Sequence, residues 1–339
     1  MLWLTRFAIM LAFVVVVLGA FTRLTEAGLG CPDWPGCYGF LTVPTAEQFD
    51  TAHARFPEQP VEVDKAWNEM IHRYFAGTLG LVILALAVLG RRKAPIHTGS
   101  LLLLVIFQAI LGMLTVTMDL KPIIVMGHLL GGFSIFVLLA LLERRLAHQQ
   151  APTTNSTLNK TTLHFFTACA ACLLITQIAL GGWTAANYAA LACTQLPICE
   201  GDWQNKLNFV QAFSPTPQAE TYQYGVLDYA ARMTIHVSHR VMAIVVAVSL
   251  LLYCVMLLKT RVFAKNALVI MVLLSGQVLL GIGNVLLSLP LAIAVAHNAG
   301  GLLLLTSLIV TWYQIYQLQD AKSKESIRAN ILVSVKELS

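Results

Sequence analysis

The chain has 339 residues, of which 57% are hydrophobic and only 12% are charged, and its mean hydropathy is +0.72. A soluble globular domain carries about 25% charged residues, so this composition excludes that class and indicates a membrane protein. The formal net charge of +5 is concentrated in a few connections between apolar runs, so we expect no nucleic-acid partner.

Eight apolar runs are long enough to cross a hydrocarbon core roughly 30 Å thick. The first run has Arg6 near its start, as a secretory signal would, but no small-residue cleavage site follows, so we keep it as a helix. The sequence therefore predicts an all-α polytopic membrane protein. In chain order the eight runs are residues 4–24, 69–90, 99–118, 123–142, 163–184, 230–258, 266–288 and 291–316.

Charge is distributed unevenly between the two sides of these predicted helices. If the N-terminus lies inside, the inner connections hold the basic runs at 91–93 and 144–145, whereas most acids fall in two long outer loops near 25–66 and 185–229. This is the positive-inside pattern of membrane proteins. It predicts that both termini are cytoplasmic.

A polar cytoplasmic linker at residues 143–162 divides the chain. We predict an N-terminal four-helix half at 1–142, a C-terminal four-helix half at 163–317 and a cytoplasmic tail at 318–339. Because each half has an even number of helices, the halves share one orientation and form a parallel repeat. The expected fold is thus two pseudo-symmetric four-helix bundles.

Sequence anchors that recur in the same order support this repeat. "GLGCPDWPGC" matches "ALACTQLPIC", "IHRYFAG" matches "SHRVMAI", "QAILG" matches "QVLLG", and "HLLGG" matches "HNAGG". The residues paired in this way are Gly19 with Gly181, Cys31 with Cys193, Cys37 with Cys199, His72 with His239, Arg73 with Arg240, Gln108 with Gln277, and His128 with His297.

Five histidines lie near the outward ends of the second, fourth, sixth and eighth predicted helices: His72, His128, His236, His239 and His297. A single membrane histidine is explained equally well by a hydrogen bond to a neighbouring helix. A pair from each half, however, matches the two axial ligands that one haem iron requires. The pattern therefore predicts two haem-sized sites at one depth.

Other metal sites fit this pattern less well. Zinc or copper would need ligands beyond two histidines, and the nearest cysteines lie in loops. A respiratory cytochrome b carries two histidines on each of two helices, whereas here four helices carry one candidate each. Glycines at 131–132 and 300–301 follow two of the histidines, and we expect them to let a flat macrocycle approach the helix.

The two predicted sites differ at one position. Glu69 precedes His72 by three residues, and His236 precedes His239 by the same spacing, so each lies on the face of its histidine. Glu69 is a candidate general base or a group that stabilises positive charge; alternatively, it is a helix N-terminal acid. Arg73 and Arg240 are candidates to bind haem propionates, or they mark the membrane interface.

The cysteines fall into two groups. Cys31 with Cys37 and Cys193 with Cys199 lie in the outer loops, where disulfides persist, so we expect two disulfides that staple the loops or exchange electrons. The remaining three are in apolar helices and are expected in the core. They are Cys169, Cys172 and Cys254.

With "TRLTEAGLGCPDWPGC", "EMIHR", "GHLLGG", "HVSHR", "LGIGNVLLSLP" and "AHNAGG" in this order, residues 5 to 315 closely resemble the haem A synthases of bacterial and mitochondrial membranes. The resemblance implies oxidation of the C8 methyl group of haem O to a formyl group, through an alcohol and a gem-diol, to supply haem A to cytochrome oxidase. It further implies a bacterial inner membrane location with the haem sites towards the periplasm.

The resemblance also implies roles for the site residues. His239 and His297 would hold a haem B cofactor, His72 and His128 would face the substrate haem O, and Glu69 would be catalytic. The same resemblance implies that the cysteine pairs are auxiliary and favours His239 over His236 as the ligand.

Partners expected on this basis are haem O synthase, cytochrome oxidase assembly factors and an electron donor or acceptor; a homo-oligomer is left open. The alternatives are a dihaem electron-transfer cytochrome and a haem carrier or assembly chaperone.

Overall fold

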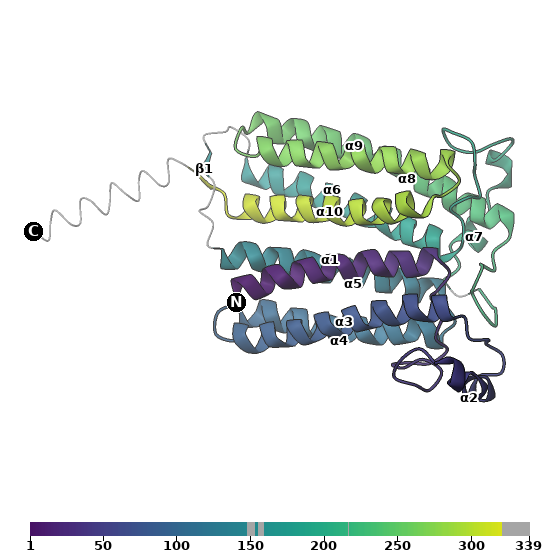
Figure 1. The fold of residues 1–339 in the computed structure, drawn as a ribbon. Helices are drawn as coiled ribbons and strands as arrows, with labels where there is room; N and C mark the ends of the chain where they lie inside the picture. The colour runs from purple at the N-terminus through teal and green to yellow at the C-terminus, as the bar shows by residue number, and fades with distance from the viewer. Residues whose placement is uncertain (148–152, 155–158, 216, 321–339) are drawn as a thin grey trace, which may run out of the picture.

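The computed structural model describes residues 1–147, 153–154, 159–215 and 217–320 (Figure 1). Within these residues, eight helices are long and apolar enough to cross a membrane, which confirms the predicted all-α membrane fold. Most of the predicted tail at 318–339 and part of the predicted linker fall outside the described residues. The eight helices are α1 (Leu2–Leu24), α3 (Val63–Gly90), α4 (Pro95–Thr117), α5 (Pro122–Leu146), α6 (Lys160–Ala186), α8 (Tyr229–Lys259), α9 (Ala264–Leu286) and α10 (Leu291–Tyr316).

Short elements occupy the connections. The N-terminus lies at one end of the helices, whereas α2 and α7, which belong to the two long connections, lie at the other (Figure 1). Strands β1 and β2, of two residues each, pair in parallel. The bounds are η1 (Ala46–Gln48), α2 (Phe49–Arg55), β1 (Thr153–Thr154), η2 (Gln204–Lys206), α7 (Phe209–Ala212) and β2 (Gln319–Asp320).

Helix α3 begins at Val63, earlier than the apolar run that predicted it. Its polar first turns carry Asp64 close to the helix N-terminus, where an acid is favourable. Hydropathy does not detect this extension because those turns are not apolar. Glu69 therefore lies beyond the first turn, and the alternative that it is a helix N-terminal acid is wrong.

Prolines mark the starts of α5 and α10, two of the histidine helices. Pro122 is in the first turn of α5, and Pro290 is the N-cap of α10. A proline is tolerated there because the first N–H groups of a helix have no partner within the helix.

Helices α1, α3, α4 and α5 pack in a closed ring of neighbours, and α6, α8, α9 and α10 pack in the same order. The two groups meet where α1 contacts α10 and where α5 contacts both α6 and α10. These contacts agree with the expected repeat, and the pseudo-symmetric relation of the two halves stays a prediction.

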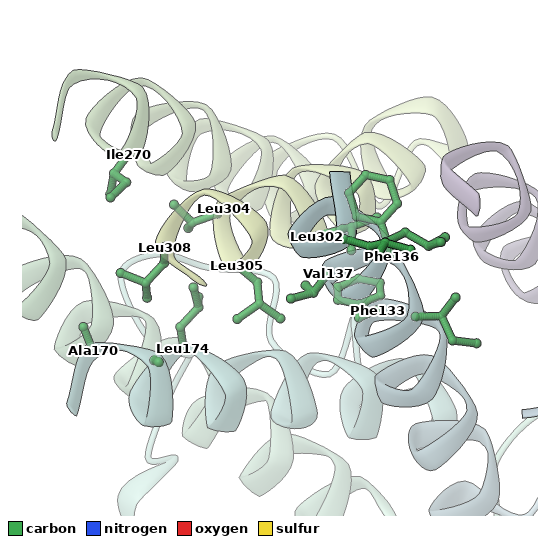
Figure 2. Packing of buried hydrophobic residues seen from close by; sticks show 14 of the residues in the cluster. Phe133, Phe136, Val137, Ala170, Leu174, Ile270, Leu302, Leu304, Leu305 and Leu308 are labelled. Atoms are coloured by element: carbon green, nitrogen blue, oxygen red, sulfur yellow. The ribbon is translucent and has the colours of Figure 1, made fainter. Parts of the chain in front are cut away.

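One apolar core joins the two groups of helices. Figure 2 shows Phe133, Phe136 and Val137 of α5 beside Leu302 and Leu305 of α10. The histidine helices α5 and α10 are therefore packed against each other, and this contact brings the two predicted sites into one region.

Two of the three helical cysteines are not where they were expected. Cys254 is buried, as predicted, but Cys169 and Cys172 of α6 are exposed. Both lie on an apolar helix surface that faces away from the other helices, and apolar composition does not distinguish that surface from the core.

Candidate functional site

A single large cavity of about 1840 Å³ is lined by residues of both groups of helices. Its volume exceeds the roughly 300–1,000 Å³ of ordinary ligand pockets. The four predicted ligand histidines, His72, His128, His239 and His297, all line it. The structure therefore brings them around one space that is large enough for more than one bulky ligand.

The histidines lie in the pairs expected from the sequence. His72 of α3 lies near His128 of α5, and His239 of α8 lies near His297 of α10. Nδ1 of His72, His128 and His297 is buried without a hydrogen-bond partner, whereas Nε2 of these rings is not buried. Nε2 is thus the nitrogen available to a ligand in the cavity.

Each ring is seated against a glycine of a neighbouring helix. A Cβ at any of these glycines would crowd the histidine Cε1, so each glycine allows the ring to approach the backbone closely. The pairs, with the distance from that Cβ to Cε1, are Gly19 and His72 at 3.0 Å, Gly112 and His128 at 3.1 Å, Gly181 and His239 at 3.2 Å, and Gly281 and His297 at 3.2 Å.

The prediction that Gly131 and Gly300 make room for a macrocycle is wrong. The space beside these glycines is filled by the amides of Gln108 and Gln277. Nε2 of Gln108 donates to the backbone carbonyl of His128 at 2.6 Å, and Gln277 makes the same bond to His297 at 2.8 Å. Each glycine therefore lets a glutamine hold the backbone of a histidine. The following glycines, 132 and 301, do line the cavity.

Glu69 is buried beside the first histidine pair and has two donors. Its Oε2 accepts from the backbone N–H of Cys31 at 2.8 Å, and its Oε1 pairs with Arg73. The Glu69 side chain is only 6% exposed. A charge at this depth requires such partners, so the two bonds explain how a carboxylate is kept at the cavity wall.

His236 takes the corresponding place in the second half. Its Nδ1 lies 3.3 Å from the backbone N of Cys193, and its Nε2 lies 3.1 Å from Nε of Arg240. Both ring nitrogens thus face protein donors, and a neutral imidazole accepts at one of them at a time. This environment differs from that of His239, whose Nδ1 contacts Gln177.

The two arginines hold the disulfide loops. Arg73 donates to the backbone carbonyls of Asp33 and Gly36. Arg240 donates to those of Cys193, Gln195 and Ile198. Both guanidinium groups are thus engaged with the loops, and the two alternatives weighed for these arginines, propionate contact and interface marking, both stay predictions.

Both predicted disulfides are present. The Cα atoms of Cys31 and Cys37 are 4.7 Å apart, and those of Cys193 and Cys199 are 4.9 Å apart, within the usual range for a disulfide. Each loop contains a cis proline before its second cysteine. The loops also reach the cavity, where Pro35 and Pro197 are part of the lining.

Sequence reasoning missed several polar residues of the cavity wall. Arg23 at the end of α1 donates to the hydroxyl of Tyr188 at 2.8 Å and to the carbonyl of Ala185 at 2.9 Å, and it joins the two halves. Gln177 contacts His239. Asn284 and Asn298 line the wall near the second pair. The sequence signal that could have identified these residues is a polar side chain within an otherwise apolar run.

Comparison with known proteins identifies the family of this chain. Residues 2–309 match the model of the COX15-CtaA family, described as cytochrome oxidase assembly protein. The chain is 46% identical to a haem A synthase of Shewanella oneidensis, over 95% of this chain and 98% of that protein. It is 27% identical to a haem A synthase of Rhizobium rhizogenes, over 90% and 86% of the respective chains.

A haem A synthase of Allorhizobium ampelinum is 26% identical, over 90% of this chain and 87% of that protein. The family match covers seven of the eight long helices and most of α10, and its range includes every histidine of the two pairs. The chain therefore belongs to the COX15-CtaA family of cytochrome oxidase assembly proteins.

Proposed function

We propose that this protein is a haem A synthase, an oxidoreductase that converts the C8 methyl group of haem O to a formyl group. The observation that carries the proposal is the cavity with two histidine pairs, of which only the first has a buried carboxylate, Glu69, beside it. Two similar sites suit two haems, and one acid suits chemistry at one of them.

The second pair, His239 and His297, is proposed to hold a haem B cofactor. Its residues fit that group because they offer two Nε2 atoms, and because Gly181 and Gly281 seat the rings without a Cβ. When bound, haem B supplies a one-electron carrier within the same cavity. The first pair, His72 and His128, is proposed to bind the substrate haem O.

Glu69 is proposed to be the catalytic residue. With water as the oxygen source, oxidation of a methyl to a formyl group releases four protons and four electrons, and an electron acceptor takes the electrons. With dioxygen as the oxidant, one oxygen atom enters the formyl group and the other leaves as water. A carboxylate near the methyl group accepts one of these protons or stabilises positive charge on the carbon. Arg73 and the N–H of Cys31 orient that carboxylate.

The cavity wall offers an entry for an apolar substrate. Lining residues such as Leu84 and Leu251 are 45% and 49% exposed on the apolar outer surface of the helices. We infer that haem O enters sideways from the bilayer. Trp34 and Pro35 of the first disulfide loop also line the cavity, so that loop covers the first site.

We infer a bacterial inner membrane location with both termini in the cytoplasm and the disulfide loops in the periplasm. The long connections lie at the end of the helices opposite the N-terminus (Figure 1), and they hold both disulfides. The partners we propose are haem O synthase as the source of substrate, cytochrome oxidase assembly factors, and an electron donor or acceptor.

Identification of the bound haems tests this function. We expect purified protein from cells that make haem O to yield haem B together with haem O or haem A on chromatography. Haem B alone at two per chain would instead favour an electron-transfer cytochrome. Ready loss of every haem would favour a carrier.

Substitution of Glu69 tests the catalytic step. Because general acid–base catalysis contributes about 10²–10⁴-fold, we expect Glu69→Ala and Glu69→Gln to lower haem A formation by about 100-fold or more, with haem B still bound. Glu69→Gln keeps an oxygen that accepts from Cys31, so it separates the charge from the loop contact. Asp64→Asn on the same helix is the control. Full activity of Glu69→Gln would remove Glu69 from the chemistry.

A further inference from the structure

The two histidine pairs differ in the carboxamide side chains around them. The sequence repeat aligns α1 with α6, α4 with α9, and α5 with α10, and in each case an amide of the second half replaces a residue without an amide in the first. The replacements are Gln177 for Val15, Asn284 for Thr115 and Asn298 for Leu129. All six of these residues line the cavity.

Gln177 holds His239 at two points. Its Nε2 lies 3.1 Å from Nδ1 of the ring and 3.1 Å from the backbone carbonyl of the same residue. The corresponding ring in the first half, His72, has Val15 at this position. The backbone of Val15 comes within reach of this ring, but Nδ1 of His72 makes no hydrogen bond of good geometry and has no side-chain partner. The ring of His239 is therefore held by a side chain, and the ring of His72 is not.

The amide of Gln177 suits a histidine that binds a metal through Nε2. Such a ring carries its proton on Nδ1 and is normally held by an acceptor there, which fixes the ring and raises its basicity. Oε1 of Gln177 is buried without a partner. Turning the amide over presents this oxygen to the Nδ1 proton, and the bond from Nε2 to the backbone carbonyl of His239 is given up in exchange.

Asn284 and Asn298 add two further buried acceptors near the second pair. Oδ1 of each is buried without a hydrogen-bond partner, although both residues line the cavity. A buried polar atom without a partner is unfavourable. Asn284 and Asn298 thus give the second site unpartnered amide oxygens at positions where the first site has none, since Thr115 satisfies its hydroxyl on the carbonyl of Gly112.

We propose that Gln177, supported by Asn284 and Asn298, makes the second histidine pair a permanent haem site, and that Val15 and its neighbours leave the first pair free to exchange its haem. This inference rests on the proposed function, because it explains how one haem is retained as a cofactor while the other turns over. Gln177 is a positioning residue in this scheme, since it acts through His239.

Substitution of Gln177 by the residue of the first half tests the proposal. Loss of such a partner lowers metal affinity by about 10–100-fold, so we expect Gln177→Val to release haem B to apomyoglobin at least about tenfold faster than the unchanged protein. Haem B is separated from haem O and haem A by chromatography. Thr176→Val, one residue away on the exposed side of α6, is the control.

Two further variants keep the test decisive if Gln177→Val folds poorly. Gln177→Glu retains an acceptor for Nδ1, so we expect it to keep haem B and to lower the reduction potential of that haem, because a more basic ligand favours ferric iron. Val15→Gln should slow release from the first pair by about tenfold. An unchanged potential and unchanged release in these variants would overturn the proposal.

The proposed function and this inference fail in different ways. If the unchanged protein forms haem A and Gln177→Val releases haem B as slowly as the unchanged protein, the function stands and the inference is wrong. If no haem A is formed but Gln177→Val loses haem B rapidly, the inference stands and the function is wrong.

Discussion

Glu69 and His236 lie at corresponding positions of the repeat and contact corresponding donors. Each faces the backbone N–H of the first cysteine of a disulfide loop and the arginine one turn later. The loop contact is therefore common to both halves, and the difference between them is the charge of the acceptor. This comparison separates a structural role, which both residues share, from the catalytic role that we propose for the carboxylate of Glu69.

Gln108 and Gly131 form a second unit at the residue scale, and we predict that they are energetically coupled. In Gly131→Ala the new Cβ meets the Gln108 amide and breaks its bond to His128. We expect a loss of about 1–2 kcal/mol in the free energy of unfolding. In a Gln108→Ala background the same change should be neutral or stabilising by up to about 1 kcal/mol, since alanine favours a helix.

Unfolding in mixed detergent, followed by circular dichroism, measures all four proteins of this cycle. Gly99→Ala is a matched control, because a Cβ there meets nothing within 4 Å. Equal effects of Gly131→Ala in both backgrounds would show that the two residues act independently.

At the scale of elements, the first disulfide loop is held by a buried tyrosine. The Tyr38 side chain is 1% exposed, and its hydroxyl donates to the carbonyl of Pro60 at 2.9 Å. Its backbone N–H donates to Asp33. Burial, and after it the negative charges of Glu62, Glu69 and Asp33, raise the pKa of Tyr38 to about 12.

We predict that this tyrosine makes the loop sensitive to alkali. Because the pKa is higher in the folded loop than the ordinary value of 10.0, the stabilisation is present below pH 10 and is lost as the pH rises from 10 towards 12. A pKa difference of this size corresponds to about 2–3 kcal/mol in the free energy of unfolding. Thermal unfolding between pH 8 and 11.5 should therefore show a decline that begins near pH 10 and is weaker in Tyr38→Phe.

The same variant should be less stable by about 1 kcal/mol at neutral pH, because it loses the bond to Pro60. Tyr224→Phe, at an exposed tyrosine of the second long loop, is the control. If Tyr38→Phe declines as steeply as the unchanged protein above pH 10, another group is responsible for the alkaline transition.

At the scale of the whole molecule, the contact between the two groups of helices determines the shape of the cavity. Gly182 of α6 lies in this contact, and a Cβ there would come 2.9 Å from Cδ2 of Leu129 on α5. The described core continues across the same contact. The two halves therefore meet by direct packing of their helices.

We predict that the halves assemble without a covalent linker. Residues 1–147 and 159–339, expressed together as separate chains with a tag on one of them, should copurify. Gly182→Phe should reduce recovery of the untagged half by about tenfold or more, because overpacking of about 1–3 kcal/mol opposes association. Gly276→Phe, where a Cβ meets nothing within 4 Å, should have little effect. Failure of the unchanged halves to copurify would show that the linker is required.

The sequence by itself determined the number of helices, the orientation expected from charge, the pairing of the loop cysteines and the four histidines of the cavity. Each of these depends on a local or repeated property. Helix number follows from apolar length because the thickness of the bilayer is fixed. The histidine pairs follow from the order of the repeat, which places His72 and His239 on corresponding helices.

Only the tertiary structure decided which side of each helix faces its neighbours. In the folded chain Glu69 accepts a hydrogen bond from the backbone of Cys31, and Gln108 packs beside Gly131. Gln177 contacts His239, and Cys169 is exposed. In water, an exposed apolar residue is unfavourable and a sequence pattern reveals the buried face. In a bilayer, lipid is as apolar as the core, so composition does not distinguish the two faces and helix packing decides between them.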